Sequence, residues 1–110
     1  MSSGEIKIKQ ILDENNIIYE REYRIKEFNI YSPFDFAIFD KNKNLIKLIE
    51  YDGEQHFYPI EHFGGECQFG QQQKNDKAKD EYCKKNNILL QRISYIEYDN
   101  ITLDMLLSVS

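Results

Sequence analysis

The sequence has little of several features that would each mark a class of protein. No apolar run approaches the roughly 18 residues that a membrane-spanning helix needs, and the first residues have no signal-peptide pattern. We therefore expect a cytoplasmic protein, in a bacterial or phage-infected cell, with no membrane partner. The two cysteines, Cys67 and Cys83, lack CxxC spacing, which favours reduced thiols over a disulfide.

Excess basic charge is also missing. The net charge is −5, which argues against a protein that holds nucleic acid by bulk electrostatics. A nuclease is not excluded, because an acidic metal site adds negative charge that bound cations then reverse locally. The sequence also has no repeats, linkers or low-complexity segments, so its 110 residues predict a single domain over 1–110.

The hydrophobic pattern predicts an α/β fold in which helices flank a mixed sheet. Ser2 and Glu5 have the spacing of a capping box, and Asn100 is expected to cap a last helix. The predicted elements are a helix over 3–15, strands over 17–24, 34–39 and 45–51, a helix over 69–85, a strand over 88–93, and the short C-terminal helix.

The second and third predicted strands form a hairpin that brings two carboxylates together. If the turn is symmetric about Asn42 and Lys43, Asp35 lies opposite Glu50. Cross-strand partners point to the same face with Cβ atoms about 5 Å apart, so two like charges would repel. A divalent cation between them turns that repulsion into ligation.

An alternative is that both carboxylates lie on a solvated face of the sheet. Asp35 sits in "PFDFAIF" and Glu50 ends "LIKLIE", and such apolar neighbours favour a partly buried location. A pair of buried acids is costly without compensation. We therefore interpret Asp35 and Glu50 as ligands of Mg²⁺ or Mn²⁺.

The stretch "PFDFAIFDKNKNLIKLIEYDGEQHF" resembles the PD-(D/E)xK nuclease superfamily. It is similar above all to the Vsr-like branch, in which a strand ends in E-x-D-G-x-x-H. This branch includes small stand-alone and phage homing-type endonuclease domains. The N-terminal "SGE" and the later "QKNDKAKDEYCKKNNILLQRISY" follow in the same order, so the resemblance covers about residues 3–95.

The resemblance implies a restriction-endonuclease-like core, α-β-β-β-α-β with a mixed central sheet, and a metal-dependent phosphodiesterase. The sequence departs from the superfamily at Asp52, where many members have the motif lysine. His56 matches the catalytic histidine of the Vsr-like branch. The resemblance therefore implies that His56 or a bound water replaces the lysine.

The remaining site residues have open alternatives. Asp52 is a further metal ligand or the first residue of an Asp-Gly turn. His56 is a general acid or base or a structural histidine, and Gln55 is expected to position water or phosphate. Glu5 is a site acid, as the resemblance implies, or only a capping glutamate.

Three lysines at the start of the second long helix are predicted to contact nucleic acid: Lys74, Lys77 and Lys79. Lys77 or Lys74 would reach the scissile phosphate and the others would hold the backbone, although a lysine-rich helix surface is often simply solvated. Gln91 is expected to face the site. The aromatic residues Phe57, Tyr58 and Phe63 are core residues or base-stacking residues.

These residues together predict an Mg²⁺- or Mn²⁺-dependent endonuclease that nicks DNA, with RNA or branched DNA as other substrates. Cleavage of both strands would need a homodimer, and sequence specificity would need an accessory partner. One alternative is an inactive nuclease-fold module that binds nucleic acid or a protein. Another is an acidic DNA mimic, which would have no need for the Asp35–Glu50–His56 arrangement.

Overall fold

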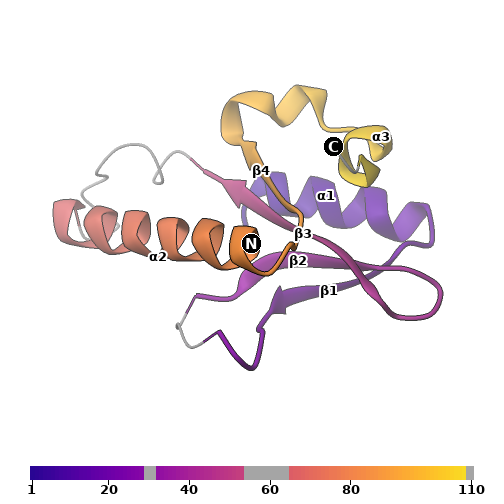
Figure 1. The fold of residues 1–110 in the computed structure, drawn as a ribbon. Coiled ribbons are helices and arrows are strands. Elements are labelled where there is room, and N and C mark those ends of the chain that lie inside the picture. The colour runs from indigo at the N-terminus through magenta and orange to yellow at the C-terminus, as the bar shows by residue number, and fades with distance from the viewer. Residues whose placement is uncertain (29–31, 54–64, 109–110) are drawn as a thin grey trace.

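The computed structural model describes residues 1–28, 32–53 and 65–108, and within the last range it describes the side chains from residue 70 onward. The chain is a mixed α/β structure with helices on both faces of a four-stranded sheet (Figure 1). The elements are α1 (Ser3–Glu14), β1 (Ile18–Tyr23), β2 (Phe34–Phe39), β3 (Leu45–Asp52), α2 (Gly65–Lys85), β4 (Leu90–Ser94), the 3₁₀ helix η3 (Tyr95–Asn100) and α3 (Leu103–Leu107).

The four strands lie in the order β1-β2-β3-β4. The pairs β1–β2 and β2–β3 are antiparallel, and β4 lies parallel to β3. A parallel neighbour requires a long crossover connection, and α2 lies within it. The sheet is therefore mixed, as the sequence predicts.

The hairpin register decides whether the two predicted acids meet. Phe36 pairs with Ile49 and Ala37 pairs with Leu48, which is the predicted register at the open end of the hairpin. Nearer the turn, an irregularity between Ile38 and Phe39 shifts the pairing by one residue. The prediction is confirmed for the strand ends that carry Asp35 and Glu50, and it is wrong only close to the turn.

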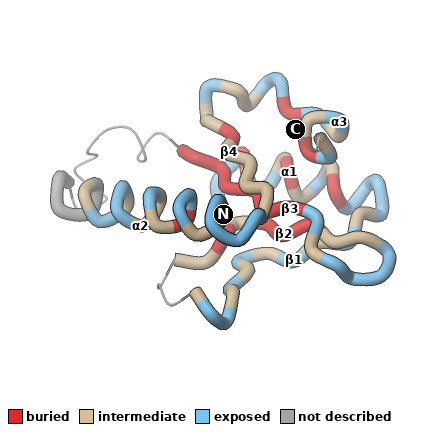
Figure 2. The backbone as a smooth tube through the Cα atoms, viewed as in Figure 1, coloured by how far each residue is buried: buried red, intermediate tan, exposed pale blue. Residues whose placement is uncertain are grey.

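The sheet has a hydrophobic core on each face. On one face, α1 and α3 pack through Ile8, Leu12 and Leu106 against strand residues that include Phe36 and Ile49. On the other face, Cys83 of α2 packs with a smaller set of residues from β2 and β3. Figure 2 shows that the buried residues are concentrated along β2 and β3. The central strands are thus covered on both sides.

The helix ends follow local signals in the sequence. Ser2 and Glu5 form the predicted capping box of α1. Asn16 and Asn87, just after α1 and α2, have positive φ angles of 56° and 55°, a conformation that asparagine tolerates at helix ends. The predicted cap at Asn100 is wrong, because Thr102 caps α3 and accepts a hydrogen bond from the Met105 amide.

Close packing fixes the start of α1 against the sheet. A Cβ atom added to Gly4 would lie 2.0 Å from the ring of Tyr51, which belongs to β3. Only glycine therefore allows this approach without a shift of helix or ring. The contact holds the neighbouring residue, Glu5, beside the end of β3.

The helices of the described residues include no segment both long enough and apolar enough to cross a membrane.

Candidate functional site

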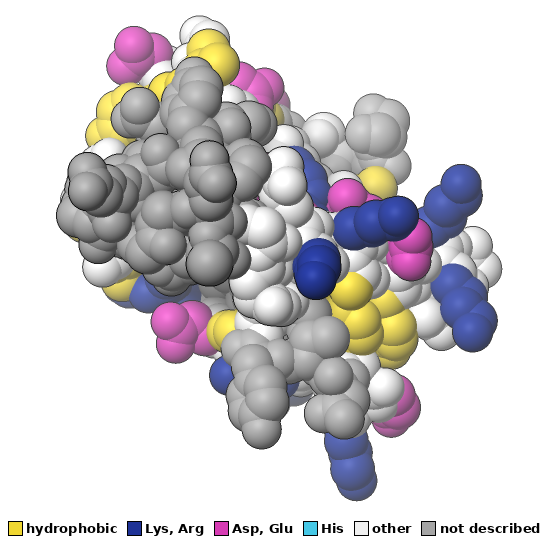
Figure 3. Space-filling model, turned by 90° about the vertical axis from the view of Figure 1, so that its left-hand side faces the viewer, with side chains coloured by type: hydrophobic (Ala, Val, Ile, Leu, Met, Phe, Trp, Pro, Cys, Tyr) yellow, Lys and Arg dark blue, Asp and Glu magenta, His cyan; other side chains and the backbone are white. Residues whose placement is uncertain are grey.

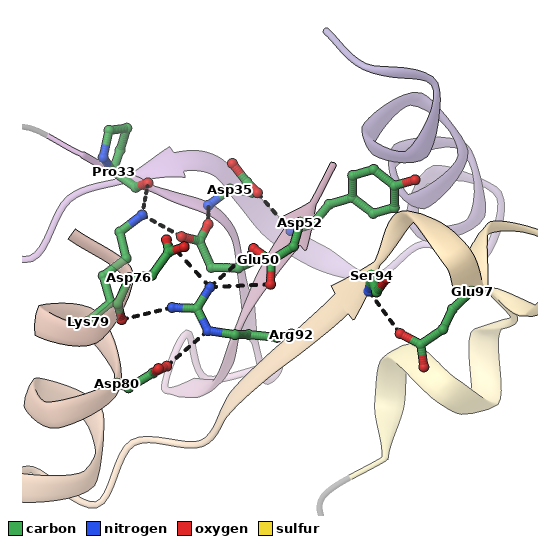
Figure 4. A network of polar contacts seen from close by, with 11 residues as sticks. Pro33, Asp35, Glu50, Asp52, Asp76, Lys79, Asp80, Arg92, Ser94 and Glu97 are labelled. Carbon is green, nitrogen blue, oxygen red and sulfur yellow. Dashed lines mark hydrogen bonds and ion pairs between the residues drawn. The ribbon is translucent and has the colours of Figure 1, made fainter. Parts of the chain in front are cut away.

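Asp35 and Glu50 lie side by side at the adjacent ends of β2 and β3 (Figure 4). Each side chain forms a hydrogen bond with the backbone of the other residue's strand. The amide of Asp35 donates to Oε2 of Glu50 at 2.9 Å, and the amide of Tyr51 donates to Oδ2 of Asp35 at 2.8 Å. Each carboxylate is thus fixed by a backbone amide of the other strand. The predicted meeting of the two acids is what the hairpin produces.

Burial makes this pair electrostatically costly. Glu50 is only 2% exposed. Desolvation, together with the negative charge of Glu50, raises the pKa of Asp35 to about 9. Within the described residues Asp35 makes no ion pair. The pair therefore keeps a proton to a higher pH than two solvated carboxylates would.

Lys79 of α2 supplies the cation that contacts Glu50. Its side chain is 3% exposed, its Nζ forms a buried ion pair with Oε1 of Glu50, and the same Nζ donates to the carbonyl of Pro33 at 2.9 Å. The ammonium also lies 5.2 Å from the centroid of the Phe34 ring. Lys79 thus bridges α2 to both strands that carry the acids.

A pocket of about 210 Å³ opens beside these three side chains. Four elements contribute to it: the start of α1, the adjacent ends of β2 and β3, and one face of α2. Its lining consists of Ser2, Glu5, Ser32, Pro33, Asp35, Glu50, Tyr51, Gly53, Gln72, Asp76 and Lys79. The lining is mostly polar, which suits a polar or charged ligand better than an apolar one.

A second charged cluster lies next to the first and contains Arg92 of β4 (Figure 4). Its guanidinium contacts Asp52 at 3.2 Å, Asp80 at 2.9 Å and Asp76 at 3.7 Å, and it donates to the Asp76 carbonyl at 2.9 Å. Asp52 lies in β3 as predicted by strand parity, but its carboxylate binds Arg92. The arrangement therefore does not favour Asp52 as a third metal ligand.

The capping role of Glu5 is confirmed, and its role as a site acid stays a prediction. Its Oε2 accepts from the Ser2 amide at 3.0 Å, which completes the capping box, and its side chain also lines the pocket. Its negative charge contributes to raising the pKa of Asp35. On the other side, Oε1 of Glu5 lies 3.9 Å from the guanidinium of Arg21. The structure thus places Glu5 in the site without a direct bond to either acid.

The three lysines predicted to bind nucleic acid are not alike. Lys74 and Lys77 are exposed on α2, whereas Lys79 is buried against Glu50. Of the three, the pocket lining includes only Lys79, so Lys77 does not join the described acids. Figure 3 views the molecule from the side on which α2 begins. Most of the Lys and Arg side chains visible in this view lie in its right half.

Other predicted residues fall elsewhere. Gln55 and His56, like the aromatic residues 57, 58 and 63, lie outside the described residues. Gln91 pairs with Ile49 in the sheet, and its side chain bonds to Lys47 and to the Met105 carbonyl at 3.0 Å. The prediction that Gln91 faces the site is wrong, because strand alternation turns it to the face covered by α3. The buried Cys83 is a free thiol, as predicted.

The carboxylate oxygens of the acid pair are suitable ligands for a hard divalent cation. Within the ranges that the structure describes, no group of three or more His, Cys, Asp or Glu side chains is arranged to hold a metal. The described donors are therefore Asp35 and Glu50, whose carboxylate oxygens suit Mg²⁺ or Mn²⁺. Desolvation and the charge of Glu50 raise the pKa of Asp35, so its negative form is disfavoured while no cation lies beside it. These two residues fit the predicted ion.

A family model described as "Protein of unknown function (DUF2726)" matches residues 3–104. The chain belongs to the DUF2726 family. No curated protein and no solved structure matches the sequence significantly. The DUF2726 match spans the described charged residues of the site, from Glu5 to Arg92. The acids, the buried lysine and the arginine cluster are thus all parts of the DUF2726 domain.

The positions of two site residues of this DUF2726 domain, Lys79 and Arg92, were not predicted from the sequence. Lys79 lies four residues before Cys83, so both share the apolar stripe of α2, whereas Lys77 does not. That spacing marks Lys79 as the lysine that faces the sheet. Arg92 precedes the buried Ile93 in β4 and lies opposite Glu50, so strand alternation turns it toward the α2 face.

Proposed function

We propose that this DUF2726 domain is an Mg²⁺- or Mn²⁺-dependent endonuclease that nicks DNA and has a restriction-endonuclease-like core. The observation that carries the proposal is the pairing of the half-buried Asp35 with the buried Glu50, with Lys79 against Glu50, in a polar pocket. The resemblance of the hairpin sequence to PD-(D/E)xK nucleases supports it from an independent direction.

The cost of the acid pair argues against a purely structural role. Desolvation of the half-buried Asp35, together with the charge of the buried Glu50 on the neighbouring strand, raises the pKa of Asp35 to about 9, so the fold carries an electrostatic strain at this point. Perturbed acids in a polar pocket are typical of sites that bind a cation or move protons. A hydrophobic pair would fill the same space at lower cost.

In the proposed reaction, Asp35 and Glu50 hold the divalent ion, which when bound would supply an activated water and charge stabilisation for the phosphate. Glu5 keeps the pocket acidic from the α1 side. Lys79 is the described cation closest to the acids, and we assign to it the role of the lysine that is absent at position 52. Its ammonium would stabilise negative charge on the phosphodiester.

DNA contact would involve the exposed part of α2. Lys74 and Lys77 lie exposed on the same helix whose inner face carries Lys79. A protein with a net charge of −5 has little long-range attraction for DNA, so a few phosphate contacts would give weak binding that added salt lowers further. Activity is therefore expected at low ionic strength.

One observation favours the alternative of an inactive binding module. Lys79 neutralises Glu50, and no third acid of the described residues joins the pair. A fold that used these residues only for stability would look similar around Glu50. It would not explain why a second carboxyl group, that of Asp35, lies beside Glu50 in the same polar pocket.

The test is cleavage of supercoiled plasmid at low salt with Mg²⁺, Mn²⁺ or EDTA. Wild type should produce nicked circles only with a metal, and Glu50→Gln should abolish nicking while retaining the shape of the side chain. Glu20→Gln, at an exposed position on β1, is the matched control and should nick normally. Metal-independent nicking, or no cleavage of plasmid, RNA or branched DNA by folded wild type, would reject the nuclease proposal.

A further inference from the structure

The contacts of Lys79 suggest a second property of the site, which rests on the proposed function. Lys79 is the only cation among the described residues that forms an ion pair with Glu50, and it also holds the Pro33 carbonyl at 2.9 Å. Both carboxylate oxygens of Glu50 are therefore engaged, since Oε2 accepts from the Asp35 amide. A metal ion that uses Glu50 would share an oxygen with one of these partners, and on Oε1 it would be repelled by the Lys79 ammonium.

The two partners of Glu50 differ in how easily they yield. The Asp35 amide belongs to the backbone of β2 and is fixed by the sheet. The Lys79 ammonium stands on a flexible four-carbon chain with three rotatable donors. Because side-chain rotation is far less costly than breaking a strand, Lys79 is the partner that gives way.

The pocket provides space for the released ammonium. Lys79 already lines it, together with Gln72 and Asp76 from the preceding turns of α2. Its second contact, with the carbonyl of Pro33, does not involve Glu50 and would keep the side chain beside the pocket, which Pro33 also lines. Displacement would thus move positive charge from a carboxylate into the volume where a phosphodiester would bind.

We propose that Lys79 is an internal competitor of the divalent cation, which occupies Glu50 in the metal-free protein and is released into the pocket when the cation binds. The metal-free domain is consequently held in an inactive arrangement by its own lysine. Cation binding and delivery of Lys79 to the phosphate become one coupled event.

The neighbouring Arg92 is a structural cation whose contacts differ from those of Lys79. Its guanidinium contacts three carboxylates and a backbone carbonyl, so the loss of one acid leaves the others in place. Lys79 has a single carboxylate. This difference predicts that a cation exchanges with Lys79 and leaves the Arg92 cluster intact.

The direct test is chemical acetylation of wild-type lysines with and without Mn²⁺, read by mass spectrometry. Lys79 should be protected in EDTA and become at least about 5-fold more reactive in saturating Mn²⁺, as expected for a side chain released from a buried pair. Lys77, which is exposed, should react in both conditions, and Lys47, buried on the opposite face, should stay protected in both.

Calorimetric titration with Mn²⁺ provides the second arm. Lys79→Met should bind Mn²⁺ at least about 10-fold more tightly than wild type, because the competitor is gone, whereas Lys47→Met should bind as wild type does. If Mn²⁺ binds but Lys79 stays protected, or if Lys79→Met binds no more tightly, the competitor proposal is rejected and the nuclease proposal stands. If neither wild type nor Lys79→Met binds Mn²⁺ at millimolar concentration, both proposals fail.

Discussion

Each face of the sheet buries one lysine, and the two lysines are held in different ways. Lys79, 2% exposed, faces α2 and pairs with the carboxylate of Glu50. Lys47, 1% exposed, lies on the face of α1 and α3 and donates to Gln91 and, at 2.8 Å, to the Ser108 carbonyl. One ammonium has a charged partner and the other has only neutral acceptors.

The difference has consequences for what each lysine can do. With no acid beside it, burial lowers the pKa of Lys47 to about 8, so this lysine is a titrating structural residue that ties β3 to the end of α3. Lys79 is held mainly by charge, and a stronger cation can compete for that charge. Burial alone therefore does not identify a functional lysine, but its partner does.

The largest expected effect is on stability when Lys79 loses its charge. In EDTA at pH 7, Lys79→Met should lower the free energy of unfolding by about 3 kcal/mol, because it leaves Glu50 buried beside Asp35 without a cation. Urea denaturation measures this. Lys47→Met is the matched control and should cost less than about 1 kcal/mol, since only neutral contacts are lost. Equal losses would remove the distinction between the two lysines.

The pH dependence of the unfolding free energy tests the state of Lys47. Its pKa is 10.5 in the unfolded chain and about 8 in the fold, so between these values the unfolded state binds more protons and stability rises with pH. Relative to Lys47→Met, wild type should gain about 2–3 kcal/mol over this window. Taking the difference in unfolding free energy between wild type and Lys47→Met at each pH removes the contributions of all other titrating groups. A flat difference would show that Lys47 is not desolvated.

Asp35 should respond in the opposite direction. Its raised pKa means that the folded state holds a proton that the unfolded chain releases above pH 4, so its contribution lowers stability as pH rises toward 9. In EDTA at pH 7, Asp35→Asn should therefore stabilise the fold by at least about 1 kcal/mol, and the gain should shrink toward pH 4. Thermal unfolding at several pH values checks this, and a destabilised variant would argue against the strained pair.

The smallest effect is expected for Lys77→Met. Lys77 is exposed on α2, so its loss should change stability by less than about 0.5 kcal/mol and reduce nicking only modestly. Denaturation and plasmid assays of the same preparation measure both quantities. If Lys77→Met lost nicking as completely as Glu50→Gln, the lysine that acts on the phosphate would be Lys77 rather than Lys79.

Much of the scaffold was predictable because it depends on local signals. The capping box at Ser2, the asparagines after the two long helices and the alternation of the central strands all act over a few residues. The meeting of Asp35 and Glu50 followed from the length of the turn between their strands. The shift between Ile38 and Phe39 did not alter it, because it lies on the turn side of the pair.

The parts that escaped prediction depend on how whole elements are oriented. Which lysine of α2 faces the sheet is set by the rotation of the helix, and its apolar stripe is thin, so Lys77 and Lys79 were not separated. Gln91 was assigned to the wrong face because the phase of β4 relative to β3 was unknown. The acids around Arg92 come from β3 and α2, which only tertiary packing brings together.

The most direct test of the account compares the two buried lysines in plasmid nicking with Mg²⁺ at low salt. Lys79→Met should lose at least about 100-fold in nicking rate, as expected for removal of a charge that stabilises the transition state, and Lys47→Met should retain the wild-type rate. Folded Lys79→Met that nicks as fast as wild type, or an equal loss in both variants, would contradict the assignment of the Asp35–Glu50–Lys79 site.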